Sequence, residues 1–233
     1  MKTQKLKPGV EYDTVDKKYD KTVMYKFDFS VNILVVEPQD DGTSDQTTLI
    51  FALGEDECAY FSEEYRPVGM KKEGTKKPDI TAIIENSNLK KIKWYIYDMK
   101  DTVNNAKTAL KLCSQWHSGI EHISMEYLNS LNDYHIDHAL GVITRCCNKE
   151  KLKKEIERYS KKINDTNQLM TARKSRTKII EYREKIRAME CIIKDVFEDY
   201  EEMTESVRRY EIEYIPLVST DGLVYKADKK INL

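Results

Sequence analysis

The chain of 233 residues has few of the features that mark several common classes of protein. It contains only eight glycines and no GxGxxG, GxxxxGK[ST] or GxSxG sequence, so the usual phosphate cradles and the serine-hydrolase elbow lack support. No apolar stretch approaches the ~20 residues that a membrane-spanning helix needs. Residues 1–8 are basic but no apolar segment follows them, so we expect no secretory signal and no membrane association.

Cysteine content and net charge further limit the cellular location and the class of protein that we expect. The five cysteines are an odd number without the spacing of a disulfide framework, so we expect a reducing, cytoplasmic location. Lys and Arg total 39 and Asp and Glu total 40, which gives a net charge of −1. Proteins that coat nucleic acid without specificity usually carry a basic excess, so this role is disfavoured, whereas a local basic face is compatible with the balance.

Two acidic residues beside apolar runs are the most informative feature. Asp79 precedes the run 80–84 and Asp98 ends the run 92–97, and both runs read as buried or half-buried strands. Lys100 lies two residues after Asp98. Two carboxylates on neighbouring strands with a lysine beside them favour a site for a hard divalent cation, Mg²⁺ or Mn²⁺, which prefers oxygen ligands. The alternative is a strand end that runs into a solvated polar turn.

These residues also resemble a known family. The segments Lys77-Pro78-Asp79-Ile80 and Tyr95-Ile96-Tyr97-Asp98-Met99-Lys100-Asp101 are similar to the motif of the PD-(D/E)XK nuclease superfamily, the restriction-endonuclease-like fold. The resemblance implies that Asp79 and Asp98 bind the metal, that Lys100 positions or polarises the attacking water, and that the Met99 carbonyl is a further metal ligand. It places the core strands at about 47–53, 79–85, 91–98 and 138–144, with a helix at about 104–118.

The chain departs from this family in one respect. Members usually carry a glutamate into the site from a helix before the first strand, and residues 10–46 predict no such helix. Glu57, Glu63 or Glu64 is the expected substitute.

Basic residues near the motif are candidates for binding phosphate, because phosphate contacts dominate nucleic-acid affinity. Lys76 and Lys77 precede Asp79. Lys107, Lys111 and Gln115 are four residues apart on one stripe of the helix expected after residue 104. We predict nucleic-acid contacts at these positions, and the alternative for each is an exposed polar surface.

From residue 148 the pattern changes to heptads. Apolar residues alternating at spacings of four and three predict a long helix over about 167–211, preceded by a shorter one. The shorter helix leaves part of the apolar seam uncovered, and that part must pack on the α/β core, on a second copy or on another protein. Of these we expect a homodimer or protein-partner interface through residues 148–211. The residues predicted for this interface are Tyr182, Ile186, Met189, Ile193 and Tyr200.

The expected organisation has three parts. An α/β core with an N-terminal hairpin of strands at 22–36 and 47–53 occupies residues 1–147, the helical region occupies 148–211, and a β-hairpin tail with an edge strand at 214–216 occupies 212–233. The predicted fold class is α/β (α+β), with a restriction-endonuclease-like mixed-sheet core and a long, coiled-coil-like helical C-terminal extension.

Together these features predict a Mg²⁺- or Mn²⁺-dependent endonuclease that hydrolyses phosphodiester bonds, with DNA as the expected substrate. A nuclease of this size with a partner-binding arm resembles effector subunits of bacterial antiviral or restriction systems. The alternative is a noncatalytic scaffold subunit that assembles through its long helix.

Overall fold

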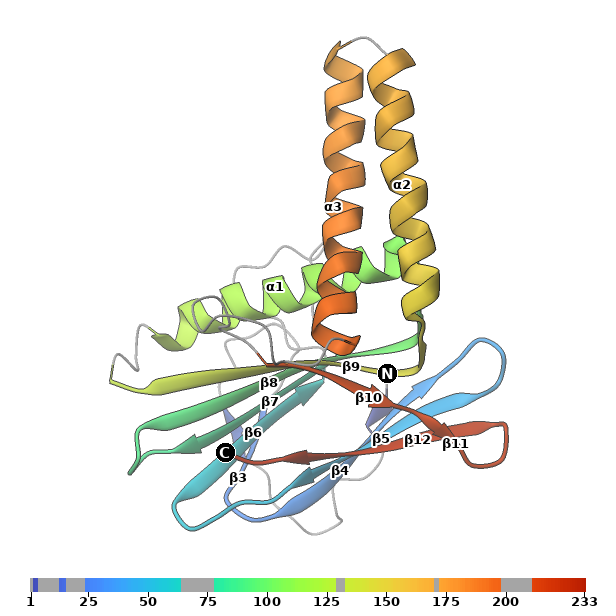
Figure 1. Ribbon diagram of the computed structural model, residues 1–233. Helices are drawn as coiled ribbons and strands as arrows, with labels where there is room; N and C mark the ends of the chain where they lie inside the picture. The colour runs from blue at the N-terminus through green and yellow to red at the C-terminus, as the bar shows by residue number, and fades with distance from the viewer. Residues whose placement is uncertain are drawn as a thin grey trace.

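The computed structural model describes residues 2–3, 13–15, 24–63, 78–128, 133–169, 172–197 and 211–233. In these residues the chain is mixed α+β, with two β-sheets and three helices. The two sheets face each other, and the helices lie on the outer side of the larger sheet (Figure 1).

The smaller sheet has five strands in the order β1-β4-β5-β12-β11. Strands β4 (Val31–Pro38) and β5 (Ser44–Phe51) form the antiparallel hairpin that the alternating sequence predicts. Strand β12 (Val224–Ile231) pairs in parallel with β5, so the end of the chain is part of this sheet. The short strands β1 (Lys2–Thr3) and β11 (Val218–Ser219) lie at its edges.

The larger sheet has seven strands in the order β10-β9-β8-β7-β6-β3-β2. Antiparallel pairing joins successive neighbours from β2 to β8. Helix α1 then crosses over to β9, which is parallel to β8, and β10 is parallel to β9. The bounds are β2 Asp13–Val15, β3 Met24–Phe27, β6 Glu57–Glu63, β7 Ile80–Asn86, β8 Lys91–Val103, α1 Ala106–Leu128, β9 His135–Cys147 and β10 Glu211–Pro216.

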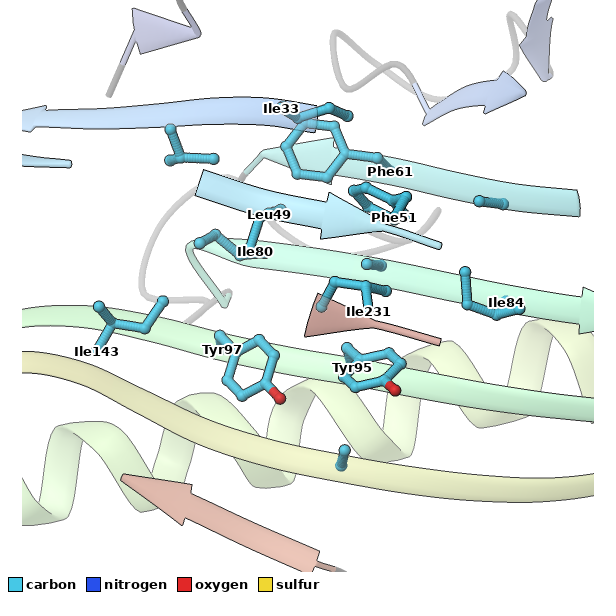
Figure 2. Packing of buried hydrophobic residues seen from close by; sticks show 14 of the residues in the cluster. Ile33, Leu49, Phe51, Phe61, Ile80, Ile84, Tyr95, Tyr97, Ile143 and Ile231 are labelled. Atoms are coloured by element: carbon cyan, nitrogen blue, oxygen red, sulfur yellow. The ribbon is translucent and has the colours of Figure 1, made fainter. Parts of the chain in front are cut away.

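A layer of buried apolar side chains joins the two sheets (Figure 2). Each such side chain contributes about 1.5–3 kcal/mol when it leaves water, so this layer fixes the strands of one sheet over those of the other. The labelled members are Ile33, Leu49, Phe51 and Ile231 of the smaller sheet and Phe61, Ile80, Ile84, Tyr95, Tyr97 and Ile143 of the larger one.

Helices cover the other face of the larger sheet. The buried Leu112 and Trp116 of α1 pack in one cluster with Trp94 and Ile96 of β8. Trp116 Nε1 also donates a hydrogen bond to the Gly141 carbonyl of β9 at 3.1 Å. Helices α2 (Lys149–Leu169) and α3 (Ala172–Phe197) form a hairpin that projects away from the sheets (Figure 1).

The predicted fold class is wrong. Two facing sheets with three helices in the described residues replace the expected single core with a long coiled-coil-like extension. Helix α3 ends at Phe197, and β10 begins at Glu211, where the long helix was expected to end. Residues 198–210, which include the predicted interface residue Tyr200, lie outside the described residues.

The apolar seam of α3 does not require a coiled coil, because a heptad repeat and the core-facing stripe of an ordinary helix share the same spacing over a few turns. Met189 and Ile193 are buried in one cluster with residues of α1 and β8, and Tyr182 and Ile186 pack against it. At these four positions the apolar stripe of α3 packs on other segments of the same chain.

Two strand assignments also need correction. The strand that pairs with β7 on the side away from β8 is β6. The core strand predicted there, at 47–53, corresponds to β5 of the other sheet. The long strand expected over 22–36 is divided into β3 and β4, which belong to different sheets.

Candidate metal site

Asp79, Asp98 and Lys100 lie together where β7 begins beside β8. Ile80 pairs with Tyr97 in the antiparallel register, so the two acidic residues are neighbours on adjacent strands. Lys100 Nζ lies 3.0 Å from Asp79 Oδ2 and 3.3 Å from Asp98 Oδ1. The three side chains therefore form one cluster, as their positions beside the two apolar runs suggest.

Asp98 is the most deeply buried member, with 0% of its side chain exposed. Its Oδ1 accepts a hydrogen bond from Lys100, whereas its Oδ2 has no partner among the described residues. Burial raises the pKa of Asp98 to about 8; the charge of Lys100 opposes this shift, and the charge of Asp79 adds to it. Without a further cation, the charged form of Asp98 is therefore disfavoured at neutral pH.

Lys100 is held as a cation. Burial acts to lower its pKa, but the charges of Asp98 and Asp79 outweigh burial and raise the pKa above its ordinary value. A lysine that stays protonated donates hydrogen bonds and stabilises negative charge, and it does not serve as a general base. Its Nζ also donates to the Met99 carbonyl at 2.9 Å, so Lys100 already occupies the oxygen predicted as a metal ligand.

Glu37 of β4 is a further acid that the sequence analysis missed. It follows Ile33 and Val35, which are fully buried, at the two-residue spacing of inward positions on that strand. Its Oε2 is buried without a hydrogen-bond partner in the described part of the chain. Burial raises the pKa of Glu37 to about 7, the charge of Asp79 raises it further, and that of Lys100 lowers it. A charged residue at an inward position was the available sequence signal.

The glutamates that the sequence nominates occupy other places. Glu57 pairs with Asn86 at the far end of β6 and β7, and its Oε2 accepts a hydrogen bond from Gly54 N at 2.8 Å. The backbone of Glu63 pairs with Ile80, beside the cluster. Glu64 lies outside the described residues.

The donor atoms of this cluster suit a hard cation. Asp79 and Asp98 offer carboxylate oxygens, and Asp98 Oδ2 is buried without a partner among the described residues. No group of three His, Cys, Asp or Glu side chains in the described ranges is placed to hold a metal. A cation here would thus have two carboxylates and several waters as ligands, which is usual for Mg²⁺ and fits Mn²⁺.

The residues predicted to contact nucleic acid are divided by the structure. Lys107 and Lys111 are exposed on α1, whereas Gln115 is only 4% exposed and belongs to the interior. Lys76 and Lys77 lie outside the described residues. The helical stripe therefore offers two cations to solvent instead of three polar groups.

The helices of the described segments include none that is long and apolar enough to cross a bilayer. Comparisons with protein-family models, with curated proteins and with solved structures found no match to this chain.

Proposed function

We propose that the chain is a divalent-metal-dependent nuclease that hydrolyses phosphodiester bonds in DNA. The observation that carries this proposal is the buried Asp98 carboxyl, whose Oδ2 has no partner in the described residues, beside Asp79 and the protonated Lys100. Perturbed acids grouped with a cation are typical of sites for acid–base and phosphate chemistry.

Each side chain has a role that its environment supports. Asp79 and Asp98 would hold the cation, and a bound Mg²⁺ or Mn²⁺ lowers the pKa of a coordinated water and stabilises charge on a phosphate. Lys100 would donate a hydrogen bond to the attacking water or to a phosphate oxygen. Hydrolysis adds water across one P–O bond, so one product keeps the phosphate and the other gains a hydroxyl group.

Glu37 would accept the proton of the attacking water, because a pKa of about 7 suits proton exchange near neutral pH. Its deprotonated form is the active one, so cleavage by the wild type should rise with pH through about 7. Glu37→Gln should lower the cleavage rate about 10²-fold and remove this rise. The measurement is the single-turnover cleavage rate between pH 5.5 and 8.5, at a Mn²⁺ concentration that saturates the site at every pH so that proton competition at Asp98 does not contribute.

Glu57→Gln is the matched control, because Glu57 lies at the far end of β6. It should keep both the rate and the pH profile. A Glu37→Gln enzyme with the wild-type profile would remove Glu37 from the proton transfer and leave the metal ligands unaffected.

The direct test of the function is incubation of the full chain with supercoiled plasmid and with linear duplex DNA in Mg²⁺, Mn²⁺ or EDTA. Nicked or linear products in Mg²⁺ or Mn²⁺, and none in EDTA, are the expected result. Intact DNA under every metal condition would count against the proposal.

The scaffold alternative has weaker support. It rests on a seam left free for a partner, but Met189 and Ile193 are buried within the chain itself. A homodimer would therefore need another surface.

A further inference from the structure

The projecting hairpin of α2 and α3, here called the arm, carries a charge of its own. Its two helices contain fifteen Lys and Arg against eight Asp and Glu, which is a net charge of +7. The whole chain has a net charge of −1, so −8 is left for the remainder. The net charge of the chain is therefore near zero because a basic arm and an acidic remainder nearly cancel.

The basic side chains of the arm are largely turned to solvent. On α2, Lys151, Lys154, Arg158 and Lys161 recur at spacings of three and four, which places them on one stripe, and all four are exposed. On α3, Arg176, Arg183, Arg187 and Lys194 are also exposed. Of these eight, Arg158 pairs with Glu155 at 2.7 Å, and the other seven make no ion pair with another described residue. Seven cations are thus open to an anionic partner.

Aromatic packing holds the two helices of the arm together. The rings of Tyr159 and Tyr182 lie 5.5 Å apart between centroids, and the apolar residues between the helices continue down to the buried Leu152. Lys162 Nζ lies over both rings, at 5.1 Å and 5.8 Å from their centroids. The exposed charges are therefore displayed on a packed hairpin, so binding need not order the two helices.

The arm starts beside the candidate metal site. Asn148 N donates to the Val103 carbonyl at 3.1 Å, which fixes the start of α2 at the end of β8. Lys100 pairs with Thr144, three residues before β9 ends, which is about 10 Å along a strand.

We propose that the arm binds the phosphate backbone of double-stranded DNA and positions the duplex near Asp79 and Asp98. The inference rests on the proposed function for the identity of the ligand. Helix α3, with 26 residues, is about 39 Å long, close to one turn of B-form DNA at about 34 Å. The exposed cations of α3, from Arg176 to Lys194, extend over about 27 Å of this helix and could meet several phosphates of one strand.

The test is fluorescence anisotropy of a labelled 30-base-pair DNA duplex with the full chain in EDTA, over a series of salt concentrations. Lys154→Gln/Lys161→Gln should weaken binding about tenfold or more at 0.1 M salt. It should also reduce the slope of log K against log salt by about 2, because each lost phosphate contact removes about 0.9. Lys226→Gln/Lys230→Gln, which removes two exposed cations from β12, is the matched control and should bind as the wild type does.

Equal binding by the arm variant and the wild type, equal losses in the two double variants, or no binding by the wild type would overturn the inference. Tighter binding of an RNA duplex of the same sequence would overturn the choice of DNA. Because EDTA prevents metal-dependent cleavage, binding through the arm can be established even if the chain never cuts DNA, so failure of the nuclease proposal is seen separately.

Discussion

Replacing Asp98 by Asn should reduce metal-dependent DNA cleavage about 10³-fold while the fold stays intact. The carboxyl group would lose its charge and one oxygen, and a metal ion in such a site supplies several kcal/mol of transition-state stabilisation, where each 1.36 kcal/mol is tenfold in rate. The fold should survive because burial already disfavours the charged form of Asp98, whose pKa is raised to about 8. The measurement is the single-turnover cleavage rate in Mn²⁺, with circular dichroism as a check of folding.

Asp228→Asn is the control for this variant, because Asp228 is an exposed acid on β12. It should cleave at the wild-type rate. Undiminished cleavage by a folded Asp98→Asn variant would show that the nuclease activity resides elsewhere in the chain.

Gly141→Ala should destabilise the protein by about 3 kcal/mol, the upper end of the usual cost of overpacking a core. A Cβ at position 141 would lie 1.9 Å from Tyr97 Cε1 and 2.0 Å from its Cδ1. The ring has no free direction in which to move, since Tyr97 is 0% exposed and its hydroxyl donates to Glu213 Oε2 at 3.0 Å. Denaturant unfolding measures the loss, which is a large part of a typical stability of 5–15 kcal/mol.

Gly54→Ala is the matched substitution, because a Cβ there would meet nothing nearer than 3.5 Å. It should change the free energy of unfolding by less than about 1 kcal/mol. Tyr97→Leu should recover part of the loss when combined with Gly141→Ala, because it removes the clashing ring atoms. A Gly141→Ala protein as stable as the wild type would mean that β8 and β9 are not packed as described.

The parts of the fold that sequence predicted well are those set by local pattern. The apolar run after Asp79 gave β7, the run that ends at Asp98 gave β8, and the helical spacing from residue 106 gave α1. The proximity of Asp79 and Asp98 followed because a short connection between two strands makes an antiparallel pair, whose register then sets the two acids side by side.

The parts that sequence could not supply depend on pairing between distant segments. Nothing local indicates that β12 pairs with β5 across more than 170 residues of chain, or that β10 pairs with β9. Glu37 reaches the neighbourhood of the site only because the smaller sheet packs on the larger one. The heptad pattern of α3 likewise could not reveal that this helix packs on α1 of the same chain, because a contact between distant segments leaves no local pattern in the sequence.

The most direct measurement of the central claim is Mn²⁺ binding to the full chain, followed by electron paramagnetic resonance of the free ion. The account predicts one site in the wild type, retained in Asp228→Asn and weakened at least tenfold in Asp98→Asn. The affinity of the wild type should rise as pH increases from 6 to about 8, because Mn²⁺ competes with the proton that the raised pKa keeps on Asp98. Wild-type and Asp98→Asn proteins that bind Mn²⁺ equally, or not at all, would contradict the account.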